Sequence, residues 1–370
     1  MDQPYILAPH LVTVQFEVFP VLNLLQSMRQ INDIDRLSGM GDWITQLAAA
    51  LPPHMKADNT QVFDFLFPVT YRMDRTPDPA MTFPEYITRF DDLTPQAAQS
   101  QVIDMIMRMP QHAPDSWRDQ PPFTADMLMN DWETFHRVIN HMMECDDEDT
   151  LAAAEVRRMY ELLNAPQAIV PLVKAHLTRL WEEYTAAEWA RVLPMIQESV
   201  TAYRQVSIDD STLIEAIRSV SGRDFAGKIE SSKLSAITQA VFIPNAHLGP
   251  YVSIFPREHV GYILFGARLP RNSRVQSPAL SRSELLVRLN ALADDVRLRI
   301  LELLTQHDEM CAQDIMEKLN LSQSSVSRHL SQLSATGYVI ERRREVNKCY
   351  SLNPDRVKDT ARALTSFLRR

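Results

Sequence analysis

The chain of 370 residues contains few cysteines and few glycines, and both shortages argue against whole classes of function. Its cysteines are Cys145, Cys311 and Cys349 alone, so a disulfide framework is improbable and a reducing cytoplasm is the expected location. The 8 glycines form neither a phosphate-binding loop nor a dinucleotide fingerprint, and the sequence contains no nucleophile elbow and no zinc-protease helix. We therefore expect neither an enzyme nor a bound cofactor.

Long apolar runs are also missing. No uninterrupted stretch approaches the roughly 20 residues that a membrane span needs. The stretch LVTVQFEVFPVLNLL contains Glu17 and lacks a basic leader, so we expect no signal peptide and no membrane partner. Hydrophobic residues nevertheless make up 45% of the chain and charged residues 23%, which is the balance of a globular protein with a substantial core. At this length two domains are the simplest expectation.

The net charge of -9 is distributed unevenly along the chain. Residues 281–370 hold 15 Lys and Arg against 12 Asp and Glu, whereas residues 1–280 hold 23 against 35. A mildly basic segment can approach nucleic acid, while an acidic body is repelled by the phosphates. The charge pattern therefore favours a nucleic-acid-binding element near the C-terminal end.

Residues 1–268 are predicted to form one mostly helical domain that a small sheet closes. Candidate helices begin near Pro20 and continue at residues 41–50, 59–66, 83–90, 95–108, 124–144, 149–163, 167–204 with a break near Pro194, 210–221 and 228–239. Three short apolar segments within residues 239–267 predict an antiparallel meander, to which a strand at residues 10–18 could add a fourth member. The polar, proline-punctuated residues 269–280 are typical of a linker.

Residues 281–370 are predicted to form a second, smaller domain of helices with one hairpin. Helices are expected at residues 281–292, 294–306, 311–319 and 322–336, and a last helix begins at Pro354 beyond the hairpin. The last helix has a stripe that is too apolar for a free tail, made of Val357, Ala361, Leu364 and Leu368. This stripe needs a partner, which is either the same elements of a second chain or the first helix, at Leu285, Leu289 and Leu292.

The helix expected at residues 294–306 indicates how this domain forms its core. Asp294 is placed to cap the helix. Helical periodicity turns Val296, Ile300 and Leu304 towards the core. The two arginines of its first turns, Arg297 and Arg299, are expected to face outward.

The helix expected at residues 322–336 has one apolar and one polar face. Val326, Leu330 and Leu333 recur at helical spacing and can seal a small core. The opposite face carries Ser324, Ser327, Arg328, Ser331 and Gln332. Short hydroxyl and amide side chains beside an arginine suit a helix that lies close to base edges in a major groove.

Signals at both ends of this helix support the interpretation. Ser322 can cap its start, Leu321 can pack on Val326, and Gly337 can end it in a left-handed conformation. Residues 338–352 read as a hairpin with a basic link, which suits phosphates. Either piece alone is more often an ordinary helix or hairpin with a solvated face. Together, behind a second short helix, they predict nucleic-acid binding.

The motifs of this domain resemble, in order, those of the winged-helix repressors of the ArsR/SmtB family; they are LADDVRLRILELL, CAQDIMEKL and LSQSSVSRHLSQLSATGYVIERRREVNKCYSL. The resemblance implies a homodimer built mainly from the first and last helices, which binds an imperfect palindrome of double-stranded DNA and responds to an inducer. It places DNA contacts at Ser324, Ser325, Ser327, Arg328 and His329, and the wing tip at Arg343, Arg344, Asn347 and Lys348. The long N-terminal domain resembles that of a longer branch of ArsR-like regulators, in which its role is unclear.

The resemblance does not extend to metal binding. Metal-sensing members carry a Cys-x-Cys-Asp element, but the corresponding residues here are Cys311, Ala312, Gln313 and Asp314, so the second thiolate is missing. Cys311 is therefore expected to be a packed residue at a helix start. A second candidate, His141 with Cys145, shares a helix face near acidic residues, but a solvated acidic helix end is the preferred interpretation. We expect no metal.

These patterns predict a mainly α protein of the α+β class: a helical N-terminal domain with a small antiparallel sheet, then a C-terminal winged helix-turn-helix domain. The expected function is sequence-specific regulation of transcription, with repression favoured, and the N-terminal domain senses an unidentified small-molecule effector or builds the assembly. The alternative is an enzyme or a protein-interaction module that uses the winged helix for targeting or dimerisation. The expected DNA contacts are Ser322, Gln323, Ser324, Ser325, Ser327, Arg328, His329, Gln332, Arg342, Arg343, Arg344, Asn347, Lys348 and Tyr350.

Overall fold

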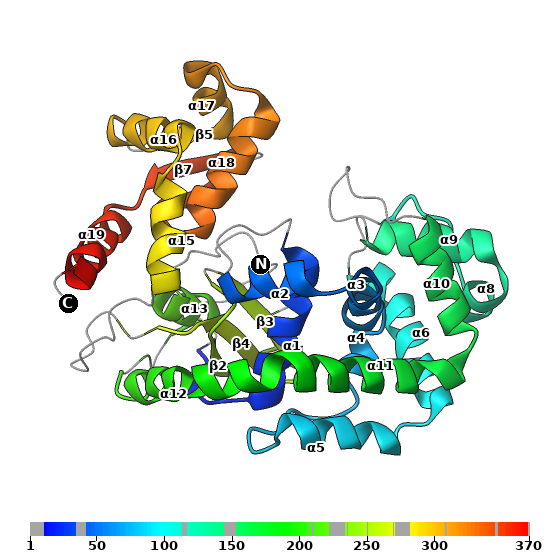
Figure 1. Ribbon diagram of the computed structural model, residues 1–370. Helices are drawn as coiled ribbons and strands as arrows, with labels where there is room; N and C mark the ends of the chain where they lie inside the picture. The colour runs from blue at the N-terminus through cyan, green and yellow to red at the C-terminus, as the bar shows by residue number, and fades with distance from the viewer. Residues whose placement is uncertain are drawn as a thin grey trace, which may run out of the picture. The chain divides into compact units, whose positions relative to one another are not determined.

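The computed structural model describes residues 11–34, 42–112, 117–143, 153–206, 208, 211–221, 234, 236–249, 251–268, 270, 282–307, 309–344 and 347–368. Within these residues the protein is mainly helical, with a four-stranded and a three-stranded sheet (Figure 1). The chain divides into two compact units: Phe19–Asn32 with Leu47–Trp189, and Met1–Val18 with Asp33–Gln46 and Ala190–Arg370. Among the described helices, none has both the length and the apolar composition that a membrane span requires.

Within its described residues the first unit contains helices and connecting loops but no strand. Its elements are α1 (Pro20–Arg29), η1 (Gln30–Asp33), α2 (Asp42–Ala50), α3 (Pro53–Thr60), η2 (Gln61–Phe65), α4 (Phe67–Thr70), α5 (Phe83–Thr88), η3 (Arg89–Asp92), α6 (Pro95–His112), α8 (Ala125–Asn130), α9 (Trp132–Met143), α10 (Ala153–Leu163), α11 (Pro166–Leu180) and η4 (Trp181–Thr185), with α2 reaching into the second unit. α11 buries Ile169, Val173 and Leu177, which recur at helical spacing, and packs against α6.

The long helix predicted at residues 167–204 differs from the structure in where it is interrupted. The predicted break near Pro194 is wrong, because Pro194 lies inside α12 (Ala186–Tyr203). The irregularity falls earlier, at the π-helical turn η4, which follows α11 directly. Proline removes one backbone hydrogen bond from a helix, and here the helix continues past it with Val192 and Ile196 buried on either side.

The sheet of the second unit mixes parallel and antiparallel pairs in the order β1-β2-β4-β3. Its strands are β1 (Thr13–Phe16), β2 (Gln239–Asn245), β3 (Val252–Arg257) and β4 (Val260–Gly266). The three predicted strands and the added fourth strand are present, but the antiparallel meander is wrong. β4 lies between the other two, parallel to β2 and antiparallel to β3. Gln239 thus begins a strand, and the rest of the helix predicted at residues 228–239 lies largely outside the described residues.

β4 can insert between β2 and β3 because the chain turns away at the end of β2. The Oδ1 atom of Asn245 accepts hydrogen bonds from the backbone N–H groups of His247 (2.9 Å) and Leu248 (2.8 Å), which ends the strand. β3 and β4 are then joined by a tight turn in which Glu258 has a φ of 48°. β2 and β4 are buried along almost their whole length, as parallel strands commonly are.

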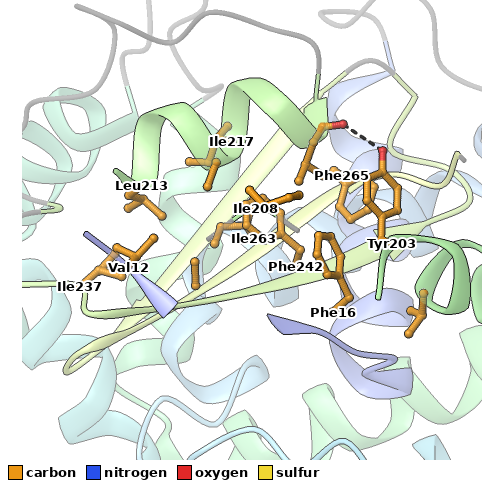
Figure 2. Close-up of a cluster of buried hydrophobic side chains, with 14 residues drawn as sticks. Val12, Phe16, Tyr203, Ile208, Leu213, Ile217, Ile237, Phe242, Ile263 and Phe265 are labelled. Atoms are coloured by element: carbon orange, nitrogen blue, oxygen red, sulfur yellow. Dashed lines mark hydrogen bonds between the residues drawn. The ribbon is translucent and has the colours of Figure 1, made fainter. Parts of the chain in front are cut away.

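One face of this sheet packs against α13 (Leu213–Ser221) and the end of α12 (Figure 2). Phe242 of β2 stacks on Phe16, with 5.4 Å between ring centroids, and Phe265 of β4 meets the edge of Tyr203 at 5.3 Å. The Tyr203 hydroxyl donates to the carbonyl of Val220 (3.2 Å), so its polar end is satisfied inside the core. Aromatic packing therefore joins segments that are nearly 250 residues apart in the sequence.

The C-terminal part has the predicted winged-helix fold. Its elements are α15 (Arg282–Leu292), α16 (Asp295–Thr305), β5 (Met310–Cys311), α17 (Ala312–Leu319), α18 (Gln323–Ala335), β6 (Val339–Arg344), β7 (Asn347–Leu352) and α19 (Pro354–Leu368) (Figure 1, yellow to red). The sheet has the order β5-β7-β6 and is antiparallel. Ile300 of α16, Ile315 of α17 and Leu330 of α18 are fully buried in one core. Of the predicted linker, residues 269 and 271–280 lie outside the described residues.

Candidate nucleic-acid interface

α17 and α18 form a helix-turn-helix with a short turn at residues 320–322. Asn320 ends α17 in the left-handed conformation, with a φ of 53°, which asparagine tolerates well. Ser322 then caps α18 as predicted, because its Oγ accepts a hydrogen bond from the backbone N–H of Ser325 (3.3 Å). Leu321 packs against the core cluster that contains Val326, which agrees with the predicted hydrophobic contact at the helix start.

α18 separates an apolar face from a polar one. Val326, Leu330 and Leu333 are buried, and they seal the helix onto α16 and α17. The opposite side is open to solvent, and Ser325 at its margin is half-buried. The exposed residues of this side are Ser322, Gln323, Ser324, Ser327, Arg328 and Ser331. We call these six residues the polar face of α18.

Gln332 of α18 turns inward, where it meets an arginine of α16. The Nη1 atom of Arg297 donates to Gln332 Oε1 (2.8 Å), while Nε and Nη2 donate to the carbonyls of Ala291 (2.6 Å) and Asn290 (2.8 Å). The expectation that Arg297 faces outward is wrong, since Arg297 is only 8% exposed. Carbonyls at the C-terminal end of α15 supply the acceptors that make this burial tolerable.

Asp294 and His329 complete this polar cluster beneath α18. The Asp294 carboxylate caps α16 by accepting from the backbone N–H of Arg297 (2.9 Å), and this hydrogen bond lowers the pKa of Asp294. His329 Nδ1 lies 3.5 Å from Asp294 Oδ1. Burial lowers the pKa of His329, and the attraction of Asp294 for the charged ring opposes but does not reverse that shift. The structure thus places His329 below the surface to which the resemblance assigned a DNA contact.

β6 and β7 form the hairpin predicted beside α18. Arg343 pairs with Lys348 and Arg344 with Asn347, so basic residues stand at the end of the hairpin. The Lys348 side chain is 62% exposed. Among the predicted DNA contacts of the hairpin, the side chains of Arg342, Arg343, Arg344 and Asn347 lie outside the described part of the chain. The prediction that these residues contact DNA therefore rests on the backbone pairing of β6 with β7.

The end of α18 is tied to the first and last helices of the winged helix. Gly337 follows α18 with a φ of 79°, the left-handed conformation predicted for it. The next residue, Tyr338, is fully buried; its hydroxyl donates to the carbonyl of Arg288 in α15 (3.2 Å) and lies 3.0 Å from Thr360 Oγ1 in α19. Tyr350, expected among the DNA contacts, is also buried, which raises the pKa of its hydroxyl, and the structure places it in the core.

The apolar stripe of α19 is incompletely covered within the described residues. Val357 is 40% exposed and Leu368 is 72% exposed, and Phe367, which the sequence pattern did not single out, is 38% exposed. The remaining predicted interface residues are exposed Ala361, half-buried Leu364, Leu289 and Leu292, and buried Leu285. α15 and α19 lie in contact, so together they present this stripe at one side of the winged helix.

Two of the cysteines meet in the second sheet. Cys311, at the end of β5 and the start of α17, pairs with Cys349 of β7, and their Sγ atoms form a disulfide. The cysteine count makes a disulfide framework improbable, yet this one disulfide forms because the strand register brings together two residues that are 38 positions apart. The sulfur beside Cys311 comes from the hairpin and not from the position of Gln313.

Of the second metal candidate, His141 with Cys145, the structure describes only His141. His141 Nδ1 lies 3.4 Å from Gln120 Nε2, and its ring packs edge-on against Trp117 with 4.5 Å between centroids. Cys145, its predicted companion, lies outside the described residues. In the part of the chain that the structure describes, no three His, Cys, Asp or Glu side chains gather as metal ligands would.

Three residues that organise this region were missed or misplaced from the sequence. Arg297 precedes Leu301 and Leu304 by four and seven positions, which is the spacing of a buried stripe, so a signal was present. Tyr338 and Cys349 carry no comparable signal, because their partners lie in other elements.

Comparison with known proteins locates the winged helix in a family. A family model described as bacterial regulatory protein, arsR family, matches residues 294–341, which run from the cap of α16 into β6. The arsenic resistance transcriptional regulator ArsR1 of Pseudomonas putida is 39% identical over 64 residues, or 17% of this chain and 50% of that protein. The arsenical resistance operon repressor of Escherichia coli is 38% identical over 63 residues, or 17% of this chain and 54% of that protein.

A further relative is matched over most of its length. The transcriptional repressor SdpR of Bacillus subtilis is 35% identical over 78 residues, which make up 21% of this chain and 86% of that protein. The chain thus spans about half the length of the two arsenic-resistance relatives, at 50% and 54%, and nearly all of SdpR.

Proposed function

This chain belongs to the arsR family of bacterial regulatory proteins, and from that premise we propose that it is a sequence-specific DNA-binding regulator of transcription that acts as a repressor. The observation that carries the proposal is the exposed polar face of α18, held beside a hairpin with basic residues at its end. Relatives named as repressors support the direction of regulation. In this proposal the protein acts by binding DNA and catalyses no reaction.

The polar face of α18 suits the floor of a major groove. Serine hydroxyls are short enough to let a helix approach base edges, and the exposed Arg328 has the planar fork that matches guanine O6 and N7. Lys348 and the arginines paired along the hairpin suit the flanking phosphates. His329, Gln332 and Tyr350 lie inward, so we assign direct contacts to the exposed residues and the hairpin end alone.

The proposed binding form is a homodimer. α15 and α19 carry the half-exposed apolar stripe, and pairing two copies would remove Val357, Phe367 and Leu368 from water. A twofold dimer of this kind presents two copies of α18 to successive major grooves about 34 Å apart, which corresponds to an imperfect palindrome in double-stranded DNA.

The N-terminal region, residues 1–268 in the proposed division, is assigned to sensing a small-molecule effector or to assembly. An effector changes DNA binding only through unequal affinity for the competent and incompetent arrangements of the winged helix. The proposed site of action is the cytoplasm, because DNA is the proposed partner.

The proposal is tested by replacing Arg328 with alanine. The binding site is first selected from random DNA by repeated capture on the full chain, and affinity is then measured by fluorescence anisotropy. We expect Arg328→Ala to weaken the selected site by about 1 to 3 kcal/mol and to relax the base preference at one position, since a bidentate contact to guanine is lost. Random DNA of the same length should be affected far less.

Arg179→Ala supplies the matched control. Arg179 is an exposed arginine of the helical unit, 53% exposed and paired with Glu183, so the change in net charge is the same. It should leave affinity for the selected site unchanged. An equal loss on selected and random DNA in Arg328→Ala, or failure of the wild-type chain to enrich any sequence, would show that α18 does not read bases.

A further inference from the structure

The disulfide between Cys311 and Cys349 joins two parts of the winged helix that the proposed DNA contacts require to be in register. Cys311 is the last residue of β5 and the N-cap residue of α17, whereas Cys349 lies in the middle of β7. On the far side of β7, Cys349 is paired with Arg342 of β6, and its neighbour along the strand is the exposed Lys348. The covalent bond therefore connects the helix-turn-helix to the basic hairpin.

The strand pairing between β5 and the hairpin is short. β5 has two residues, and its register with β7 consists of Met310 opposite Tyr350 and Cys311 opposite Cys349. α17, which starts at this point, packs directly against α18. A bond at Cys311 and Cys349 therefore fixes β7 covalently to the start of α17, and cutting the bond leaves that position to the two-residue pairing and to the packing of Tyr350 in the core.

We propose that Cys311 and Cys349 form a reversible thiol–disulfide site, through which low-molecular-weight thiols and disulfides set the affinity of the winged helix for DNA, with the disulfide form binding more tightly. The inference rests on the proposed function in that DNA affinity is its output. Disulfides in reducing compartments are usually transient and redox-sensing, and this bond joins two elements rather than stapling a small core.

The exchange is balanced by a glutathione-type couple. Two protein thiols and one molecule of glutathione disulfide give one protein disulfide and two molecules of glutathione; two electrons pass from the protein sulfurs to the glutathione sulfurs, and the two thiol protons follow. In the reducing direction a glutathione thiolate attacks the Sγ of Cys311, breaks the S–S bond and leaves Cys349 as the thiolate, which takes up a proton. A second glutathione thiolate attacks the glutathione sulfur of the mixed disulfide, forms glutathione disulfide and releases Cys311.

The order of attack follows from exposure. Cys349 is fully buried, whereas Cys311 is half-buried at the start of α17. A soluble thiol reaches only the Cys311 side of the bond, which agrees with the mixed disulfide forming at Cys311.

The disulfide form is assigned the higher affinity because it holds the hairpin and α18 in one arrangement before DNA is met. In the reduced form the same contacts need the hairpin to be positioned during binding, which costs conformational entropy. Couplings of this type commonly change affinity by about 5-fold to 150-fold. We expect at least about fivefold tighter binding in the oxidised state.

The test uses the full chain in buffers of defined glutathione and glutathione disulfide. Differential alkylation followed by mass spectrometry measures the fraction of Cys311 linked to Cys349, and fluorescence anisotropy measures affinity for the selected DNA in the same samples. The bond should form and reopen without unfolding, checked by circular dichroism, and affinity should follow the linked fraction. Cys145→Ser should behave as wild type. Cys311→Ser, and separately Cys349→Ala, should bind with equal affinity in both buffers.

Each outcome decides between the two proposals. Absence of the Cys311–Cys349 link in oxidising buffer, less than a twofold difference in affinity between the two states, tighter binding in the reduced state, or a difference that persists in both cysteine variants would overturn the thiol–disulfide site while leaving DNA regulation standing. Failure to retain any DNA sequence in either redox state would instead overturn the proposed function, and the inference with it.

Discussion

Replacing Arg297 with lysine should loosen α18 without changing the net charge. The guanidinium of Arg297 makes three hydrogen bonds, to Ala291, Asn290 and Gln332, at 2.6, 2.8 and 2.8 Å. A lysine ammonium at the end of a flexible stem can keep about one of them, since it lacks the planar fork. At about 1.5 kcal/mol for each hydrogen bond from a charged group, the loss of two costs about 3 kcal/mol.

Hydrogen exchange of the α18 amides measures this cost directly. A fall of about 3 kcal/mol in the free energy of opening should speed exchange of the protected amides by roughly a hundredfold, since each 1.4 kcal/mol is a factor of ten. The effect should be confined to α15, α16 and α18, because Arg297 lies in α16 and its three acceptors lie in α15 and α18. Affinity for the selected DNA should fall in parallel, because the polar face of α18 is then held less firmly.

Arg299→Lys is the matched control for this experiment. Arg299 lies two positions away on the same helix and is exposed, so the same chemical change meets no buried acceptors. Exchange in α18 should remain as in the wild type. If Arg297→Lys left α18 equally protected, or if Arg299→Lys accelerated exchange as strongly, the buried arginine would not hold the helix.

Two further predictions concern the helical unit and the dimer. Burial lowers the pKa of His176 from 6.5 to about 4, so between these two pH values the imidazole is protonated in the unfolded chain and neutral in the folded chain. The contribution of His176 to the free energy of unfolding is therefore complete above pH 6.5 and should fall by about 2 kcal/mol at pH 5, which calorimetry can measure. His176→Gln should lose this dependence and exposed His54→Gln should keep it, whereas an equal pH response in both would contradict the assignment. Leu368→Glu puts a charge on the apolar stripe and should weaken self-association, measured by sedimentation, at least about tenfold. Lys358→Glu, at an exposed position of the same helix, should not weaken it. A wild-type chain that stays monomeric would refute the interface.

The winged helix could be predicted from the sequence almost residue by residue. α18 was expected at residues 322–336 and is found at Gln323–Ala335. The accuracy has a local cause, because Ser322 caps the start, Gly337 permits the left-handed end, and Val326 and Leu330 set the buried face. Each of these signals acts within a few positions of the residue that it places.

The pairing of the first sheet could not be predicted in the same way. Alternation and β-branched content located the strands, but the neighbour of each strand is decided by contacts between distant segments. β4 pairs with β2 in parallel because the Asn245 turn carries the chain past the position next to β2. Nothing within residues 239–267 alone distinguishes that path from a meander.

The candidate site was predictable on its exposed side and not on its buried side. Serine and arginine spacing identifies the polar face of α18, but the helical stripe of Val296, Ile300 and Leu304 leaves Arg297 on the outer side, where an arginine is ordinarily expected because a buried charge is costly. The cost disappears only when the carbonyl ends of α15 are known to lie within reach. Cys349 was overlooked for a related reason, since its partner is fixed by strand register rather than by spacing.

The buried contacts also indicate how a change elsewhere can reach the polar face of α18. Arg297 links the last carbonyls of α15 to Gln332 in α18, and Tyr338, just beyond the end of α18, donates to the Arg288 carbonyl of the same helix. α18 is therefore held near its C-terminal end, at Gln332 and just beyond it at Tyr338, to one short segment of α15, residues 288–291. A displacement of that segment acts on both contacts at once, because both anchor the same end of α18. In the proposed dimer, any effector that shifts α15 against its partner must also shift or release α18, which is the unequal affinity that regulation requires.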